Sequence, residues 1–302
     1  MRDSEYGSKG QTASRLLASC AIALTAAVGF APAVVADPNP APSDTQNQDT
    51  MYPHPVRDDL VSKIMALSPG NVHNRIAGSF FDSPTAPPAA TELANQGRVL
   101  VGPGTPLLVG YGEAEQVCTV TVTGRDNQDR LVGITAGHCG RPGTAVRSMD
   151  AIEVGPFGTI ERVNDELDYS VIVFDDRAEL TADYNNARIS QTGPLPAPGS
   201  ELCKLGIATG KTCGPAWTSI DVANPKPANI EAQVCASQGD SGAPVFQGET
   251  LVGMIRGARL QPACVTPLQG ALFAPTLVTS IDAIFADINA NPGAGQGLRI
   301  TT

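Results

Sequence analysis

The sequence has little histidine, with only three in its 302 residues. His54 lies in a proline-rich stretch and His73 in a polar one, whereas His138 stands in segment 135–139, which reads TAGHC. Imidazole is the side chain most often used as a general base near neutral pH. If the chain has such a base it is therefore His138; the alternative is a structural histidine whose hydrogen bonds are satisfied.

Positive charge is also in deficit, because 20 Lys and Arg face 30 Asp and Glu, for a formal net charge of −10. Proteins that bind nucleic acid or an anionic membrane surface present basic patches. We therefore expect no nucleic acid and no stable membrane partner.

Closely spaced cysteine pairs are absent as well. None of the seven cysteines forms a Cys-x-x-Cys pair, and only His138 lies near any of them, which argues against a zinc site. We expect no metal and no other cofactor. Apart from Cys20, near the N-terminus, six cysteines remain and can pair in fifteen ways, which indicates an oxidising compartment.

The N-terminus has the three parts of a secretion signal. Three basic residues, Arg2, Lys9 and Arg15, precede a largely apolar run over residues 16–30 and a small-residue ending over residues 31–36. This pattern predicts a signal peptide over residues 1–36, cleaved after Ala36, and hence a secreted protein in the extracellular space or cell envelope. The alternative is a retained membrane anchor.

Residues 37–97 are dominated by Pro, Ala and polar side chains and can bury little apolar surface. They are predicted to be a disordered or propeptide-like segment, with a short amphipathic helix over residues 58–67. The folded domain is predicted to cover residues 98–302.

That domain has the pattern of an all-β protein, because short β-rich runs alternate with Gly, Pro and Asn turns. The predicted strands are 118–122, 131–135, 158–163, 169–174, 218–222, 243–246 and 251–255. The length suffices for two antiparallel β-barrels with the active site between them. Near the end, apolar residues recur at helical spacing and predict a C-terminal α-helix packed on the second barrel. These residues are Leu277, Ile281, Ile284, Phe285 and Ile288.

Two further segments supply partners for His138. Segment 239–244 (GDSGAP) contains Ser241, and Asp168 opens the β-rich run 168–174 (DYSVIVF). His138, Asp168 and Ser241 follow the chymotrypsin order of a catalytic triad rather than the subtilisin or α/β-hydrolase order. Asp165, Asp175 and Asp176 are also close by, and we prefer Asp168 because it begins a strand that would fix its position.

The glycines around Ser241 predict an oxyanion site. Gly239 and Gly242 allow a sharp bend that presents the N–H groups of Gly239 and Ser241 towards one point. A structural turn, in which Ser bonds only to local backbone, is the alternative.

Together these motifs resemble the chymotrypsin-fold serine proteases, and within them the bacterial branch that includes the streptogrisins and α-lytic protease. Cys235 stands six positions before Ser241, and segments 202–206 (LCKLG) and 209–214 (TGKTCG) resemble the small disulfide loop of that branch. The resemblance covers roughly residues 115 to 290.

The resemblance implies three disulfides and a buried ion pair. The bridges are Cys118–Cys139, Cys203–Cys213 and Cys235–Cys264. Lys204 takes the place of an arginine of that branch and would neutralise Asp240, so that activation needs no newly freed amino terminus. The alternative is cleavage after Arg98, which would release Val99.

The resemblance also implies a substrate pocket and strand. Their residues are Ala236, Ser237, Gln238, Ile255, Arg256, Gly257 and Ala258. Because residues 235–238 offer no carboxylate, substrates with Lys or Arg before the scissile bond are disfavoured, and apolar residues such as Leu, Met or Phe are expected. Three positions depart from the branch, which has Gly in place of Ala243, Ser in place of Arg256 and Gly in place of Ala258. The long Arg256 side chain could pair with Asp168 or extend into solvent. If Arg256 points into the pocket, acidic residues are selected instead.

The resulting prediction is a secreted, monomeric serine endopeptidase acting on protein or peptide substrates through an acyl-enzyme. The alternative is a secreted protease-like binding protein with weak or no peptidase activity, because Arg256 departs from the branch pattern. An esterase of the Gly-Asp-Ser type is disfavoured, since such enzymes place the serine motif early and the histidine last.

Overall fold

The computed structural model describes residues 86–112, 115–218, 228–258, 264 and 272–302. The predicted signal peptide, the helix predicted over residues 58–67 and most of the strand predicted over residues 218–222 lie outside the described residues. Among the helices of the described part, none is long and apolar enough to cross a membrane.

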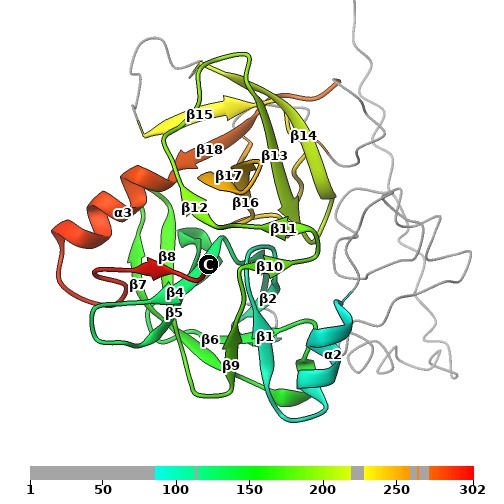
Figure 1. Cartoon of the computed structure of the whole chain (residues 1–302), viewed down its shortest axis with the longest axis vertical. Helices are drawn as coiled ribbons and strands as arrows, with labels where there is room; N and C mark the ends of the chain where they lie inside the picture. The colour runs from blue at the N-terminus through cyan, green and yellow to red at the C-terminus, as the bar shows by residue number, and fades with distance from the viewer. Residues whose placement is uncertain (1–85, 113–114, 219–227, 259–263, 265–271) are drawn as a thin grey trace, which may run out of the picture. The chain divides into compact units, whose positions relative to one another are not determined.

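An eight-stranded antiparallel sheet forms the first barrel, in the order β19-β4-β5-β8-β7-β6-β2-β3 (Figure 1). Its strands are β2 (Pro106–Val109), β3 (Gln116–Thr119), β4 (Val122–Arg125), β5 (Leu131–Ala136), β6 (Ala145–Ser148), β7 (Gly158–Asn164), β8 (Tyr169–Phe174) and β19 (Arg299–Ile300). Strand β3 runs into β4 through Val120 and Thr121, whose N–H groups donate to Thr105 and Ile134 at 2.9 and 2.8 Å. One continuous segment therefore joins the two sides of the sheet and closes the barrel. The strand predicted over residues 118–122 is wrong in its bounds, because it spans this junction.

The second barrel is a closed ring of six antiparallel strands, since β17 pairs with both β16 and β18. The ring consists of β13 (Glu201–Gly206), β14 (Gly210–Trp217), β15 (Asn229–Ala232), β18 (Thr276–Ser280), β17 (Thr250–Ala258) and β16 (Pro244–Gln247). Its apolar core includes Leu202, Val245 and Ile255. The predicted all-β architecture of two antiparallel barrels is thus confirmed.

Shorter elements connect and flank the barrels. They are β1 (Val99–Val101), β9 (Ala178–Leu180), β10 (Asp183–Tyr184), β11 (Ala187–Arg188), β12 (Gln191–Thr192), η3 (Gly137–Cys139) and η4 (Ile152–Val154). Strands β10 and β11 form a hairpin, and β12 extends the second sheet beside β17.

A helix that the sequence did not predict, α2 (Pro88–Ala94), lies within the segment expected to be disordered or propeptide-like. Its Ala90 and Ala94 are buried, and the chain continues into β1, which pairs in parallel with β9. The structured part of the chain therefore begins before residue 98.

The C-terminal helix α3 (Ile281–Ala290) confirms the predicted helix, with two corrections. Leu277 lies in strand β18, and the helix begins after Ser280, whose Oγ accepts a hydrogen bond from the Ala283 N–H. The buried face of α3 contacts both barrels rather than the second alone, because Ile284 and Ile288 share an apolar cluster with the first barrel. Figure 1 shows α3 at the side of the molecule, alongside β18 and β7.

Asp287 ties α3 to the first barrel through polar contacts. It accepts hydrogen bonds from the Tyr169 hydroxyl, from Asn164 at 3.0 Å and from Arg162 at 3.4 Å. Burial alone would raise the pKa of Asp287, but the hydrogen bonds from Tyr169 and Asn164 and the Arg162 guanidinium lower it below its ordinary value of 3.8.

A carboxylate with a lowered pKa stabilises the fold near neutral pH, and this contribution disappears as the pH falls through the folded-state pKa. We expect Asp287→Asn to reduce the free energy of unfolding at pH 7 by about 1 kcal/mol. The difference from wild type should shrink when the pH falls below 3.8. Urea unfolding at both pH values measures it, with the exposed Asp176→Asn as control. An equal loss at neutral and acid pH would contradict this role.

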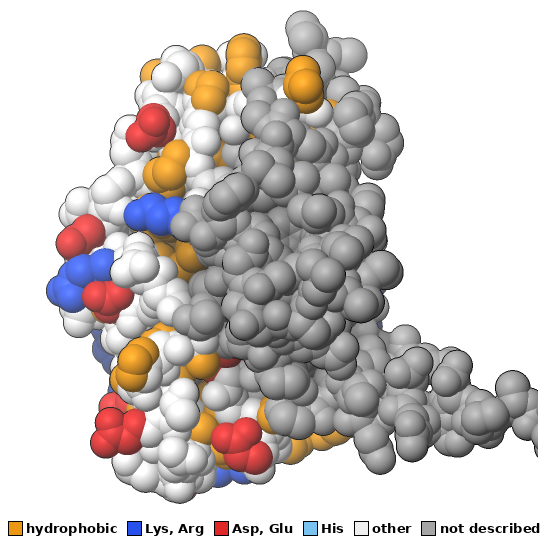
Figure 2. Space-filling model, turned by 90° about the vertical axis from the view of Figure 1, so that its right-hand side faces the viewer, with side chains coloured by type: hydrophobic (Ala, Val, Ile, Leu, Met, Phe, Trp, Pro, Cys, Tyr) orange, Lys and Arg blue, Asp and Glu red, His pale blue; other side chains and the backbone are white. Residues whose placement is uncertain are grey.

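Figure 2 shows one face of this domain. On it, acidic and basic side chains of the described residues lie side by side, and hydrophobic side chains form small separate groups. The described residues on this face therefore form no extended area of one charge.

Candidate active site

The first barrel positions His138 and Asp168 next to each other. His138 lies in η3, directly after β5, and Asp168 directly precedes β8, which pairs with β5 so that Ala136 faces Tyr169. The Gly137 N–H donates to the Asp168 carbonyl at 2.8 Å, and a Cβ on Gly137 would lie 2.9 Å from the Tyr169 nitrogen. The close approach of the two strand ends therefore requires glycine at residue 137.

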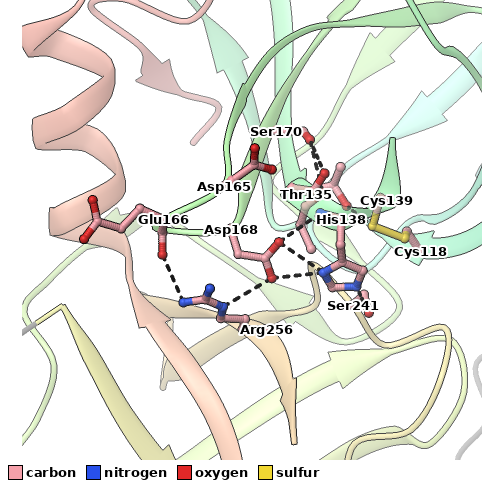
Figure 3. A network of polar contacts seen from close by, with 12 residues as sticks. Cys118, Thr135, His138, Cys139, Asp165, Glu166, Asp168, Ser170, Ser241 and Arg256 are labelled. Atoms are coloured by element: carbon pink, nitrogen blue, oxygen red, sulfur yellow. Dashed lines mark hydrogen bonds and ion pairs between the residues drawn. A yellow bond between two sulfur atoms is a disulfide. The ribbon is translucent and has the colours of Figure 1, made fainter. Parts of the chain in front are cut away.

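Asp168 has a backbone φ of 54°, in the left-handed region that Asp and Asn adopt more readily than most other residues. Its carboxylate accepts from the His138 backbone N–H at 2.9 Å and lies 2.9 Å from Nδ1 of the same residue. On the other side of the ring, His138 Nε2 lies 2.8 Å from Ser241 Oγ. Figure 3 shows this chain of contacts from carboxylate to imidazole to hydroxyl.

The structure thus brings His138, Asp168 and Ser241 together. The rival carboxylate, Asp165, points elsewhere: it pairs with Arg141, and 75% of its side chain is exposed. An imidazole held through Nδ1 by a carboxylate and facing a hydroxyl through Nε2 is the arrangement that activates a serine.

Ser241 comes from the second barrel, in the loop between β15 and β16, and the first barrel holds this loop in place. The Thr119 N–H donates to the Ser241 carbonyl at 2.8 Å, and the Thr121 hydroxyl to the Gly242 carbonyl at 2.6 Å. Gly242 has a φ of 85°, and a Cβ there would lie 2.3 Å from the Thr119 carbonyl oxygen. Glycine is thus required beside the nucleophile by both backbone conformation and space.

The residues predicted to form the oxyanion site lie in the same turn. Gly239 has a φ of 101°, and its carbonyl accepts from the Thr119 hydroxyl at 2.9 Å. Within the described part of the chain, the N–H groups of Gly239 and Ser241 have no protein acceptor. Their role as donors to a ligand oxygen stays a prediction.

Asp240 is fully buried behind the nucleophile and is compensated by several donors. Lys204 Nζ, also fully buried, lies 3.1 Å from its Oδ2, and the Ala208 N–H donates to its Oδ1 at 2.7 Å. The Thr209 hydroxyl, which the sequence analysis did not single out, lies 2.6 Å from Oδ2. A Cβ on Gly206 would lie 2.2 Å from Asp240 Oδ1, so the carboxylate occupies space that only glycine leaves open.

Burial lowers the pKa of the Lys204 ammonium, and the Asp240 carboxylate beside it opposes this effect. Val99 meanwhile is fully buried in β1, and Arg98 pairs with Glu179 at 2.5 Å. Asp240 therefore has its cation without any contribution from an amino terminus at residue 99.

The six cysteines pair as the resemblance implies. The bridges are Cys118–Cys139, Cys203–Cys213 and Cys235–Cys264. The first joins β3 to the histidine turn η3, and the second joins β13 to β14.

Of the residues predicted to bind substrate, three lie in the nucleophile loop between β15 and β16, and the other four lie in β17. Ala236 and Ile255 are buried in the core of the second barrel, Ser237 and Gly257 are half-buried, and Gln238 is exposed. Ala258 ends β17, and the residues flanking Cys264 lie outside the described part of the chain. A substrate-binding role for these residues stays a prediction.

Arg256 contacts the histidine–carboxylate pair. Its Nε lies 3.4 Å from Asp168 Oδ2, and its guanidinium donates to the Glu166 carbonyl at 3.1 Å (Figure 3). The structure therefore has the Arg256 side chain beside the Asp168 carboxylate.

Comparison with solved structures identifies the architecture. A protease from Nocardiopsis (NAPase) aligns with a TM-score of 0.51 at 21% identity, over 68% of this chain and 100% of that one. Protease A of Thermobifida fusca aligns with a TM-score of 0.51 at 22% identity, over the same shares of the two chains. The protein therefore has the chymotrypsin fold, which confirms the resemblance at the level of the fold.

Comparison of sequences places the chain more narrowly, although no family model matches it. The Mycobacterium tuberculosis protein named "Uncharacterized protein Rv1815" is 30% identical over 165 residues, which cover 51% of this chain and 69% of the relative. The protein MT1863, from another strain of the same organism, matches equally. The chain belongs to the family of these mycobacterial proteins.

Proposed function

We propose that the protein is a secreted serine endopeptidase that hydrolyses peptide bonds through an acyl-enzyme. The observation that carries the proposal is the hydrogen-bonded chain from Asp168 through His138 to Ser241, with 2.9 and 2.8 Å on the two sides of the imidazole.

In this mechanism His138 accepts the proton of Ser241 as the hydroxyl attacks the substrate carbonyl, and Asp168 stabilises the imidazolium that forms. The N–H groups of Gly239 and Ser241 receive the negative oxygen, each contributing about 2.7–4 kcal/mol to the stabilisation of the transition state. His138 then returns the proton to the leaving amine, and water releases the acyl group by the same steps in reverse.

For the residue before the scissile bond we propose an apolar side chain such as Leu, Met or Phe. The Arg256 guanidinium is engaged by Asp168 and the Glu166 carbonyl, which disfavours its use as a partner for acidic substrates. Profiling with a peptide library tests this proposal, and dominant cleavage after Glu, Asp, Lys or Arg would contradict it.

The activity itself is tested by labelling with a fluorophosphonate probe and by turnover of an unstructured protein substrate. We expect covalent modification of Ser241, and its loss in Ser241→Ala and His138→Ala with the fold retained. Thermal unfolding of each variant provides the control for folding. A folded, processed sample that neither reacts nor cleaves would exclude a peptidase and favour the protease-like binding protein.

A further inference from the structure

Contacts between the two barrels lie on both sides of the His138 ring. On the Nε2 side, the Thr119 N–H donates to the Ser241 carbonyl at 2.8 Å and the Thr121 hydroxyl to the Gly242 carbonyl at 2.6 Å. These bonds hold the nucleophile loop of the second barrel against the first barrel. They do not reach the carboxylate on the Nδ1 side of the ring.

On the Nδ1 side, the second barrel contacts the first through Arg256. Its guanidinium donates to the Glu166 carbonyl at 3.1 Å, and its Nε lies 3.4 Å from Asp168 Oδ2 (Figure 3). Only 25% of the Arg256 side chain and 11% of the Asp168 side chain are exposed, so solvent screens this contact only in part. One side chain of the second barrel thus contacts two residues of the β7–β8 turn.

A β-bulge in β17 sets the direction of the Arg256 side chain. Ile255 pairs with Val278 and Gly257 with Leu277, so Arg256 is an extra residue without a partner of its own on β18. A bulge of this kind bends the strand and changes the direction in which a side chain points.

The bulge is anchored to the nucleophile loop. The Gly242 N–H donates to the Ile255 carbonyl and the Ile255 N–H to the Ala243 carbonyl, each at 2.9 Å. The backbone next to Arg256 is therefore bonded directly to the residues that follow Ser241.

The β7–β8 turn, residues 165–168, is held at Glu166 from two directions. The Asn164 side-chain oxygen accepts from the Glu166 and Leu167 N–H groups, both at 2.9 Å. The Glu166 carbonyl accepts from Arg256 at 3.1 Å. Both backbone polar groups of Glu166 are thus hydrogen-bonded, two residues before the carboxylate that contacts the imidazole.

We propose that Arg256 is a positioning residue that ties the β7–β8 turn to the nucleophile loop and so keeps the Asp168 carboxylate in line with the His138 ring. A planar guanidinium has N–H groups in a fixed fork and can contact a carboxylate and a carbonyl at the same time. Asp168 has a φ of 54°, and such a conformation persists where the surrounding contacts hold it. The inference rests on the proposed function for its consequence in catalysis, but not for its first test.

That test is amide hydrogen exchange in the full chain, because the His138 backbone N–H donates to Asp168 Oδ1 at 2.9 Å and reports on the place of the carboxylate. Arg256→Met keeps the aliphatic stem and removes the guanidinium. We expect the His138 N–H to exchange about tenfold faster in this variant, since its acceptor is less firmly held. Exchange of the Thr119 N–H, on the other side of the ring, should be unchanged.

Arg141→Met is the matched control, since it removes an arginine that contacts the same turn at the exposed Asp165. Its His138 N–H should exchange as in the wild type. Arg256→Lys keeps the charge but lacks the fork, so it should give an intermediate rate, and it decides the outcome if Arg256→Met does not fold.

Three results would overturn the proposal. The first is a wild-type exchange rate of the His138 N–H in the Arg256 variant. The second is an equal acceleration of the His138 and Thr119 N–H groups, as a general loss of stability would produce. The third is the same acceleration in Arg141→Met.

Hydrogen exchange separates this inference from the peptidase proposal, because it requires no turnover. Faster exchange at His138 in a chain that does not react with fluorophosphonate would leave the role of Arg256 intact and remove the peptidase. In an active enzyme, Arg256→Met should lower kcat by about 10- to 100-fold with KM unchanged, the cost of a small displacement of a reacting group. An unchanged kcat in an active enzyme would overturn the role of Arg256.

Discussion

Asp168→Asn is expected to lower kcat/KM by about 10⁴-fold, the loss that follows when a triad carboxylate becomes an amide. In Asp168→Asn the side-chain oxygen can still accept the hydrogen bond from the His138 backbone N–H, which is 2.9 Å long in the wild type. The NH2 group of the Asn side chain then faces Nδ1 of His138. The ring would then carry its proton on Nε2 and could no longer accept one from Ser241. Asn also tolerates the φ of 54°, so the backbone should remain as it is.

Asp165→Asn is the matched control, because this carboxylate lies three residues away and pairs with the exposed Arg141. Its kcat/KM should stay within about twofold of wild type, as expected for a surface ion pair. Rates of peptide hydrolysis and of fluorophosphonate labelling measure both variants. A large loss in Asp165→Asn together with a small loss in Asp168→Asn would reverse the assignment.

Lys204→Met is expected to inactivate the protein and to reduce its free energy of unfolding by about 3–5 kcal/mol, because it leaves a buried carboxylate without its cation. The variant Lys211→Met makes the same change on the next strand, where the side chain is exposed, and should be close to wild type. Adding Asp240→Asn to Lys204→Met should recover part of the lost stability, since the uncompensated charge is then removed. Denaturant unfolding and probe labelling provide the readouts.

The same experiment separates two modes of activation. If Asp240 depended on an amino terminus released at Val99, Arg98→Gln would block activity and Lys204→Met would be tolerated. The structure favours the opposite result, because Val99 pairs with Ala178 inside a strand and Lys204 already lies 3.1 Å from Asp240. We expect Arg98→Gln to retain full activity.

The arrangement of the site was predictable where chemistry limits the choice of residue. A single suitable histidine, a serine between glycines and a carboxylate at a strand start are local signals, and the structure joins all three. The side-chain direction of Arg256 was not predictable, since the bulge in β17 depends on pairing with a strand about twenty residues away.

The boundary of α3 shows a second limit of sequence patterns. Leu277 fits the helical spacing but lies in β18, where pairing with β15 and β17 outweighs the periodicity. Ser280, whose side chain accepts from the Ala283 N–H, is the signal that would have marked the start of the helix. Helix α2 has no side-chain cap and begins at Pro88, in the Pro- and Ala-rich segment that was predicted to be disordered. Proline is common in the first turn of a helix, so Pro88 is a signal that could have marked its start.

The position of β19 has a consequence for how this protein folds. Arg299 and Ile300 pair with Arg125 and Gly124 at the edge of the first barrel, after the chain has traversed the whole second barrel. During synthesis the first barrel therefore lacks this strand until the whole second barrel has emerged, so the first barrel cannot be completed before the second has been made. Such long-range pairing makes folding slow and leaves the β4 edge open to other chains in the meantime. The protein is therefore most exposed to misfolding before β19 has paired with β4, and not once the fold is complete.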